Sequence, residues 1–283
     1  MSVDALTRDR SLPELVPAGD GPAPLAARLW SATWPKLLAV GLALAVWQLV
    51  VLSGWKPEFV LPGPATVGVE LWHKMATAKL WLEIATTMQR AVVGYTVAVL
   101  FGSLLGIAVS RWRVLRLAVG SLITGLQTMP SIAWFPLAIL LFQLSESAIL
   151  FVVVLGAAPS VANGIIGGID HVPPQLLRAG HMLGAHGLAR YRYVVLPAAL
   201  PSYVGGLKQG WAFAWRSLMA GELLVIIQGR PALGADLQLA RDDSDAPGLL
   251  AVMVVILVLG MVMDHVFTRW SDGMRRRRGL AVG

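Results

Sequence analysis

Long apolar runs follow one another along almost the whole chain after residue 35, and short polar segments separate them. A helix needs about 20 apolar residues to cross a hydrocarbon core of roughly 30 Å. Six runs fit this length, so we predict an all-α, polytopic membrane protein with about six transmembrane helices. The predicted spans are 36–55, 88–110, 116–142, 147–169, 200–228 and 247–268.

Two of the predicted spans contain residues that disturb the apolar pattern. Arg90 lies at the edge of the second span, where we expect its long side chain to snorkel to the lipid headgroups rather than to contact a solute. Pro130 and Pro136 lie inside the third span, and a proline removes a backbone donor and clashes with the preceding turn. We therefore predict a kink or a break in that span.

The composition supports a membrane protein and argues against a catalytic domain. Hydrophobic residues make up 56% of the chain and charged residues 14%, and the mean hydropathy is +0.68. We predict a mobile tail at 1–35, a membrane domain at 36–270 and a basic tail at 271–283. This leaves no room for a soluble enzyme domain. Cysteine is absent and the histidines lack metal-ligand spacing, so we expect no disulfide, no metal site and no enzymatic activity.

The positions of Lys and Arg predict the orientation of the chain. Basic clusters at 111–116, 178–192 and 269–278 follow the second, fourth and sixth predicted spans. By the positive-inside rule, these segments and both termini face the cytoplasm. The net charge of +7 is then a consequence of topology and of contact with anionic membrane lipid, and no nucleic-acid partner is expected.

The polar segment between the fourth and fifth spans, 172–195, predicts a helix, a bend and a second short helix. Residues 175–182 can continue as helix after a proline pair, Gly184 ends that helix, and 188–195 can form another turn. The segment has one apolar and one basic face. That pattern is typical both of a helix docked in a groove of another protein and of a helix lying on lipid headgroups, and amphipathicity alone does not separate the two.

This segment resembles the EAA loop of binding-protein-dependent ABC importer permeases. The loop pattern is Glu-Ala-Ala, three residues, Gly, nine residues, an aliphatic residue, one residue and Leu-Pro. Two positions depart from it, because Arg178 stands where the pattern has Glu and Gly180 where it has the second Ala. The family's Glu contact is therefore not carried onto Arg178. The candidate residues of an ATPase-coupling loop are Arg178, Ala179, Gly180, Leu183, Gly184, Val194, Leu196 and Pro197.

Four further segments carry the resemblance along the rest of the chain. They are 61–64 (LPGP), 90–94 (RAVVG), 130–136 (PSIAWFP) and 215–223 (WRSLMAGEL), and they are similar to the nitrate, sulfonate, taurine and bicarbonate branch of that family. The fold implied is that of a type I ABC importer permease with a cytoplasmic coupling helix.

The resemblance also implies partners and a location. Such a permease works in the bacterial inner membrane as a dimer, with cytoplasmic ATPase subunits that bind the 175–192 segment. We expect a homodimer, and a heterodimer stays open. A periplasmic or lipid-anchored binding protein delivers the solute. The sequence agrees on one point independently, since it contains no G-x-x-x-x-G-K-[ST] phosphate loop. We therefore expect no cofactor in this chain, with ATP handled by a partner.

Charged residues in the fifth predicted span are candidates for the translocation pathway. Arg216 lies near mid-depth, where a lipid-facing arginine costs about 2.5 to 3.5 kcal/mol, so it should face a partner helix or the pathway. Its pairing with Glu222 along one helix is disfavoured, because residues six apart point about 120° from each other. A pair with another helix or with the dimer mate stays open. The pathway candidates are Gln209, Phe213, Arg216 and Glu222.

Two functions from different classes fit these features. The first is the permease subunit of an ATP-driven importer for a small anion such as a sulfonate, nitrate, taurine or bicarbonate. The alternative is a secondary carrier without an ATPase partner, which should show internal repeats and acidic residues at mid-membrane. The sequence shows neither feature, so the importer is favoured.

Overall fold

The computed structural model describes residues 25–277 and divides the chain into two units, Met1–Trp55 and Lys56–Gly283. In the first unit, the apolar helix α1 spans Leu25–Leu52. It begins upstream of residue 36, so the predicted tail at 1–35 is corrected for its last part, which is helical. Residues 1–24 of that predicted tail lie outside the described residues.

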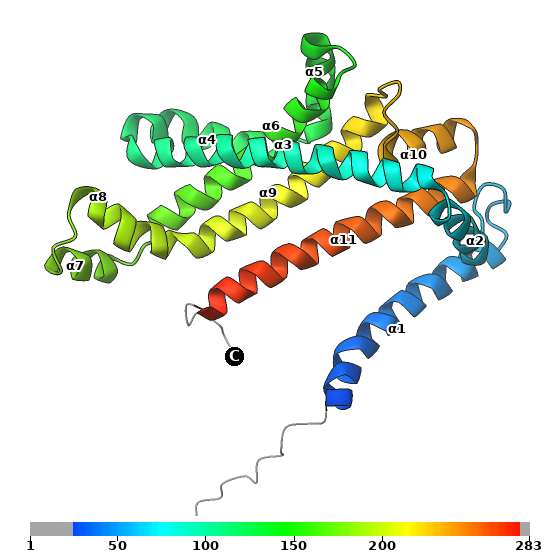
Figure 1. Ribbon diagram of the computed structural model, residues 1–283, viewed down its shortest axis with the longest axis horizontal. Coiled ribbons are helices and arrows are strands. Elements are labelled where there is room, and N and C mark those ends of the chain that lie inside the picture. The colour runs from blue at the N-terminus through cyan, green and yellow to red at the C-terminus, as the bar shows by residue number, and fades with distance from the viewer. Residues whose placement is uncertain (1–24, 278–283) are drawn as a thin grey trace, which may run out of the picture. The chain divides into compact units, whose positions relative to one another are not determined.

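Three long helices form the centre of the second unit: α3 (Ala78–Arg111), α6 (Glu146–Asp170) and α9 (Leu196–Leu224). They cross one another closely and bury an apolar core that includes Ile149 and Leu218 (Figure 1). Glycine residues permit the close approach of α6 and α9. A Cβ at Gly164 on α6 would lie 2.8 Å from the Cα of Gly206 on α9, so neither position accepts a side chain without separating the helices.

The third predicted span is broken. Helix α4 (Arg113–Thr128) is followed by the short helix η1 (Ser131–Trp134) and by α5 (Phe135–Phe142), and the two parts are bent by 106°. Pro130 causes the break because its ring disfavours helix at Met129, which is extended (φ −74°, ψ 129°). Pro136 lies in the first turn of α5, where its missing N–H is tolerated. The predicted break is therefore confirmed.

Shorter helices lie at the two ends of the second unit (Figure 1). One end carries α2 (Pro64–Met75) and α10 (Leu233–Asp242), which both pack on α11 (Ala246–Arg277). The other end carries α7 (Pro174–Met182), α8 (Gly187–Arg190) and the π-helical turn η2 (Tyr191–Val195). Helix α11 continues seven residues into the predicted basic tail, and 278–283 lie outside the described residues.

Among the described residues, four helices are long and apolar enough to cross a membrane, namely α1, α3, α6 and α11, and the bent pair α4 and α5 makes up to five. The remaining predicted span, 200–228, is α9. This helix has the necessary length but carries Lys208, Arg216 and Glu222, which lower its hydropathy. The all-α membrane fold is confirmed, and α9 is the polar member of its centre.

Candidate functional site

The helix–glycine–helix loop forms as the sequence predicts. Helix α7 ends at Met182, and Gly184, two residues further on, has a φ of +82°, a conformation that residues with a side chain rarely adopt. Two backbone bonds close it, from Gly184 N–H to His181 O (3.0 Å) and from Ala185 N–H to Gly180 O (2.9 Å). This pair of bonds is a Schellman motif, which satisfies the last carbonyls of the helix. The bend is therefore fixed by hydrogen bonds.

Gly180 fixes α7 against the turn that leads into α9. It is buried, and a Cβ there would lie 2.7 Å from Cγ2 of Val194. The alanine of the EAA pattern would require Val194 to move, so the two residues fit each other. Val194 lies in the π turn η2, in which Leu196 N–H bonds to Tyr191 O, and Pro197 follows in the first turn of α9. Val194, Leu196 and Pro197 thus connect the loop to α9.

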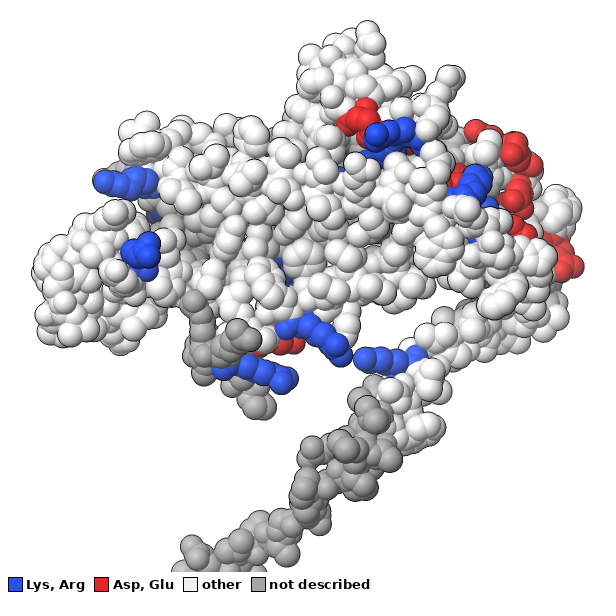
Figure 2. Space-filling model, viewed as in Figure 1, with Lys and Arg blue, Asp and Glu red and all other residues white. Residues whose placement is uncertain are grey.

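The outer surface of the loop combines apolar tips with arginines. Met182, Leu183 and Leu188 are 82%, 87% and 85% exposed. Arg178 and Arg190 are also exposed and line one hollow of about 490 Å³ with Leu177, His181 and Met182. Figure 2 shows basic but no acidic side chains over α7 and α8. Ala179 is half-buried.

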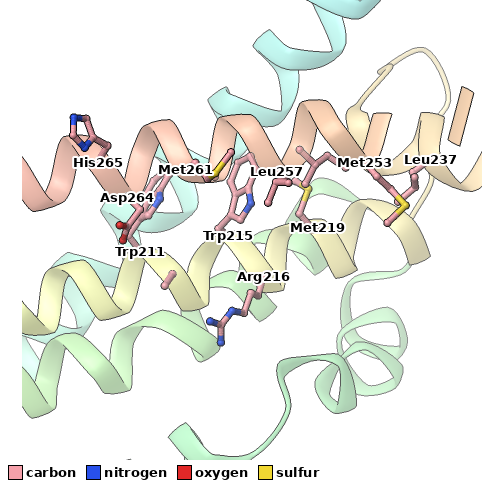
Figure 3. Close-up of a pocket in the computed structure, with 13 residues that line it drawn as sticks. Trp211, Trp215, Arg216, Met219, Leu237, Met253, Leu257, Met261, Asp264 and His265 are labelled. Carbon is pink, nitrogen blue, oxygen red and sulfur yellow. The ribbon is translucent and has the colours of Figure 1, made fainter. Parts of the chain in front are cut away.

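The pathway candidates on α9 separate into two groups. Gln209 and Arg216 are exposed and Phe213 is half-buried, with the Arg216 guanidinium 5.8 Å from the Phe213 ring centroid. Among the described residues, Arg216 forms no ion pair. In Figure 3 it points away from α11 and from the other labelled side chains. Glu222 belongs to the second group, since it is fully buried.

Arg216 reaches a hollow of about 340 Å³ at the break between α4 and η1. The wall opposite α9 comes from 126–132 and Trp134, and α6 contributes Leu155 and Gly156. Because Gly156 has no side chain, the Ser217 hydroxyl approaches this wall, and it is buried without a hydrogen-bond partner among the described residues. The hollow therefore combines one cation with mixed walls, in which Gln127, Thr128 and Ser131 are polar.

A hydrogen-bonded chain extends from the same break into α6. Gln127 on α4 donates to Ser160 (2.9 Å) and accepts from Asn163 (2.7 Å). These bonds hold the end of α4 against the centre of the unit. These hydrogen bonds therefore hold the break between α4 and η1 in place, and the break forms one wall of the hollow.

Glu222 lies in a buried ion network, apart from the exposed face of α9 that carries Gln209 and Arg216, and its place in the pathway stays a prediction. Arg90 donates to Glu222 (3.0 Å), and Thr87 and the backbone N–H of Gly234 donate to the other oxygen (2.9 and 3.1 Å). Arg90 also binds Glu146 with two bonds of 2.7 and 2.8 Å. Arg230 lies 3.3 Å from Glu146.

The same network corrects the expectation that Arg90 snorkels. The side chain is 4% exposed and joins α3, α6 and α9. The sequence carried a signal for this, because Arg90 and Glu222 are opposite charges in apolar segments, where each needs a partner. The spacing rules compare residues within one helix, so they missed a pair formed between helices.

A second ionic cluster holds α10 to α2 and α3. Asp236 is 7% exposed and accepts bonds from Lys74 (2.9 Å) and Lys79 (2.6 Å), and Lys79 also lies 3.5 Å from Glu83. Burial alone would raise the pKa of Asp236, but the hydrogen bonds from Lys79 and Lys74 outweigh it and hold the pKa below its ordinary value. The cluster stabilises the end of the unit opposite the loop.

A larger groove lies between α9 and α11. Its volume is about 730 Å³, and it is lined mainly by apolar side chains, including Trp211, Trp215, Met219 and Met261 (Figure 3). Asp264, at one end, lies 3.3 Å from Lys208. Within the described residues, no group of three potential metal ligands lies together.

The chain is similar to transport permeases over most of its length. A family model described as "Binding-protein-dependent transport system inner membrane component" matches residues 98–276. The chain is 30% identical to the riboflavin transport system permease protein RibX of Chloroflexus aurantiacus, over 84% of this chain and 91% of that protein. It is also 30% identical to the aliphatic sulfonates transport permease protein SsuC of Escherichia coli, over the same shares of the two chains.

Solved structures give the same fold. An inward-facing conformation of the MetNI methionine ABC transporter matches with a TM-score of 0.58 at 20% identity, covering 69% of this chain and 97% of that one. At this identity the likeness supports the fold alone. The resemblance seen in the sequence, including the sulfonate branch, is confirmed by these comparisons.

Proposed function

This chain belongs to the family of binding-protein-dependent transport system inner membrane components, the ABC importer permeases, and on that basis we propose how its own residues serve import. The chain is a multi-pass membrane protein. It forms the pathway for a small anion and couples to cytoplasmic ATPase subunits through 175–192. The observation that carries this proposal is the preformed loop of α7 and α8, joined through Val194 and Pro197 to the helix that carries Arg216.

The loop suits contact with an ATPase subunit. Its bend is fixed at Gly184 and its helix is packed through Gly180, so little conformational freedom is lost on docking. Leu183 and Leu188 are exposed at the bend and can enter an apolar pocket, as anchor residues of helix-in-groove contacts do. The chain lacks a phosphate loop, so ATP binding is assigned to the partner.

The surroundings of Arg216 favour an anionic solute. It is a guanidinium without an ion pair among the described residues, beside a hollow at the broken helix. An arginine facing lipid at mid-depth would cost about 2.5 to 3.5 kcal/mol, so this face of α9 requires a water-filled path or a second subunit. The exposed side chains of Gln209 and Arg216 lie seven residues apart and share that face. SsuC is named for sulfonates, whereas RibX is named for riboflavin.

The remaining partners follow from this assignment. A second copy of the chain covers the polar face of α9, and an external binding protein delivers the solute at the end that carries α2 and α10. The basic loop and both termini face the cytoplasm of the cell, as the distribution of arginine indicates. The protein resides in the bacterial inner membrane, in contact with anionic lipid.

Copurification tests the coupling. The tagged chain, isolated from its own cell, should retain an ATPase subunit, identified by its G-x-x-x-x-G-K-[ST] loop. The double change Leu183→Asp and Gly184→Pro should abolish this recovery while the protein still inserts in the membrane. Gly229→Pro in a loop on the opposite side provides the matched control. Uptake that continues without any ATPase would instead support the secondary carrier.

A further inference from the structure

The α7–α8 loop carries only positive charge. The chain has no Asp or Glu between Asp170 and Glu222, and Asp170 is already 2.8 Å from Arg116. Among the described residues, Arg178, Arg190 and Arg192 form no ion pair. These cations are therefore available to a partner.

Two of the arginines are held in a fixed relation to the apolar tips. Arg178 on α7 and Arg190 at the end of α8 line the same hollow, together with Met182. Two hydrogen bonds close the end of α7 at Gly184, and the contact between Gly180 and Val194 holds α7 against η2, the turn that directly follows α8. The loop thus presents an apolar centre with cations around it, an arrangement typical of protein interfaces with a dry core and a charged rim.

We propose that the partner of this loop is an ATPase subunit whose docking cleft is apolar at its floor and lined by carboxylates at its rim, with one carboxylate facing Arg178. The inference rests on the proposed function. A cleft that presents a cation at that place would repel Arg178. The EAA pattern has Glu at this position, so the charge of the contact is reversed here, and the pairing is selective for this chain's own ATPase.

The shape of the loop favours a protein over a lipid surface. A helix that lies on headgroups needs one continuous apolar stripe. Here α7 has nine residues and α8 has four, and the bend at Gly184 interrupts any stripe. Leu183 and Leu188, on either side of the bend, are the most exposed of the loop's leucines. They project from the bend as anchors for a pocket.

Charge reversal tests the proposal. Arg178→Glu and Arg190→Glu are expected to lower recovery of the identified ATPase about tenfold for the first and severalfold for the second. Arg178→Gln should lose less than Arg178→Glu, because it removes attraction without adding repulsion. Arg111→Glu is the matched control, since Arg111 is an exposed arginine at the end of α3, outside the 175–192 segment and outside the hollow. Its recovery should equal that of the native chain.

A reciprocal change in the ATPase subunit provides the decisive test. Replacing the facing carboxylate of the ATPase with arginine should restore recovery of the Arg178→Glu chain and reduce that of the native chain. Recovery of Arg178→Glu at or above the native level would overturn the inference while leaving the importer assignment intact. Failure of the native chain to retain any ATPase would instead remove the proposed function, and this inference with it.

Lipid binding is tested separately by thiol labelling. A single introduced cysteine can be labelled selectively, because the chain has no native cysteine. A Leu183→Cys chain, reconstituted in bilayers of neutral or of anionic lipid, is exposed to a thiol reagent with and without the ATPase. We expect the ATPase to slow labelling about tenfold and anionic lipid to leave it unchanged. Protection by anionic lipid alone, at the level given by the ATPase, would overturn the proposal.

Discussion

Arg90 on α3 donates a 3.0 Å hydrogen bond to Glu222 on α9, across 132 positions of sequence. Both side chains are almost completely enclosed, at 4% and 0% exposed. Glu146 at the start of α6 accepts two more bonds from the same guanidinium. One side chain therefore connects the three central helices at one end of the unit.

Removing one partner of the Arg90–Glu222 ion pair should destabilise the protein strongly. Arg90→Leu leaves the buried Glu222 carboxylate without its cation, and such a loss typically costs about 3 to 5 kcal/mol. The double variant Arg90→Leu with Glu222→Leu should be destabilised less than Arg90→Leu alone, because it removes the uncompensated charge. Thermal unfolding in detergent measures both. A double variant less stable than the single one would contradict the account.

The adjacent glycines Gly205 and Gly206 of α9 should differ sharply in whether they tolerate a side chain. A Cβ at Gly206 would lie 2.7 Å from the Cα of Gly164, whereas a Cβ at Gly205 has no atom within 4 Å. Gly206→Ala should therefore destabilise the α6–α9 contact by about 2 kcal/mol or more. Gly205→Ala should be neutral or stabilising by up to roughly 1 kcal/mol, through helix propensity. Equal melting temperatures for the two variants would exclude the proposed contact.

Stability should depend on Asp236 in a defined pH range. Its pKa is held below the ordinary 3.8, so its ion pairs stabilise the folded state above pH 3.8, and this contribution is lost as the pH falls further. The melting temperature of Asp236→Asn should lie below that of the native chain near neutral pH. The difference should narrow below pH 4. Asp243→Asn, which removes an exposed charge next to the same helix, serves as the control.

Arg216 should matter for uptake more than for folding. It forms no ion pair among the described residues, so Arg216→Gln should change the melting temperature little. Uptake of an anionic solute should fall by about tenfold or more, because the cation beside the hollow is lost. Arg216→Lys should retain part of the activity. Arg241→Gln, an exposed change in the last turn of α10, should leave uptake unaltered.

The sequence predicts elements whose causes are local. Gly184 ends α7 because its φ is positive, and Pro130 breaks the third span through its own ring, so both follow from residue type and position. Pairs formed between helices have no local cause. The partners of Arg90 and the burial of Glu222 depend on how three helices pack, and no spacing rule within one helix contains that information.

The beginning of α1 shows another limit of apolar length as a signal. The helix starts at Leu25 because residues before the apolar run, such as Ala26, Ala27 and Leu29, favour helix although they do not extend the span. The opposite holds for α9, where charged residues lower the hydropathy of a long central helix. Hydropathy thus indicates which part of a helix contacts lipid, whereas helix propensity indicates where the helix begins and ends.

Helix α9 runs without interruption from the π turn to Leu224, next to the enclosed Glu222. At about 1.5 Å per residue its 29 residues extend roughly 43 Å. A helix resists compression along its axis, so a push on α7 and α8 would reach the far end as a displacement of the whole helix. The buried Arg90–Glu222 contact and Arg216 would then move together with the loop, as parts of one mechanical lever.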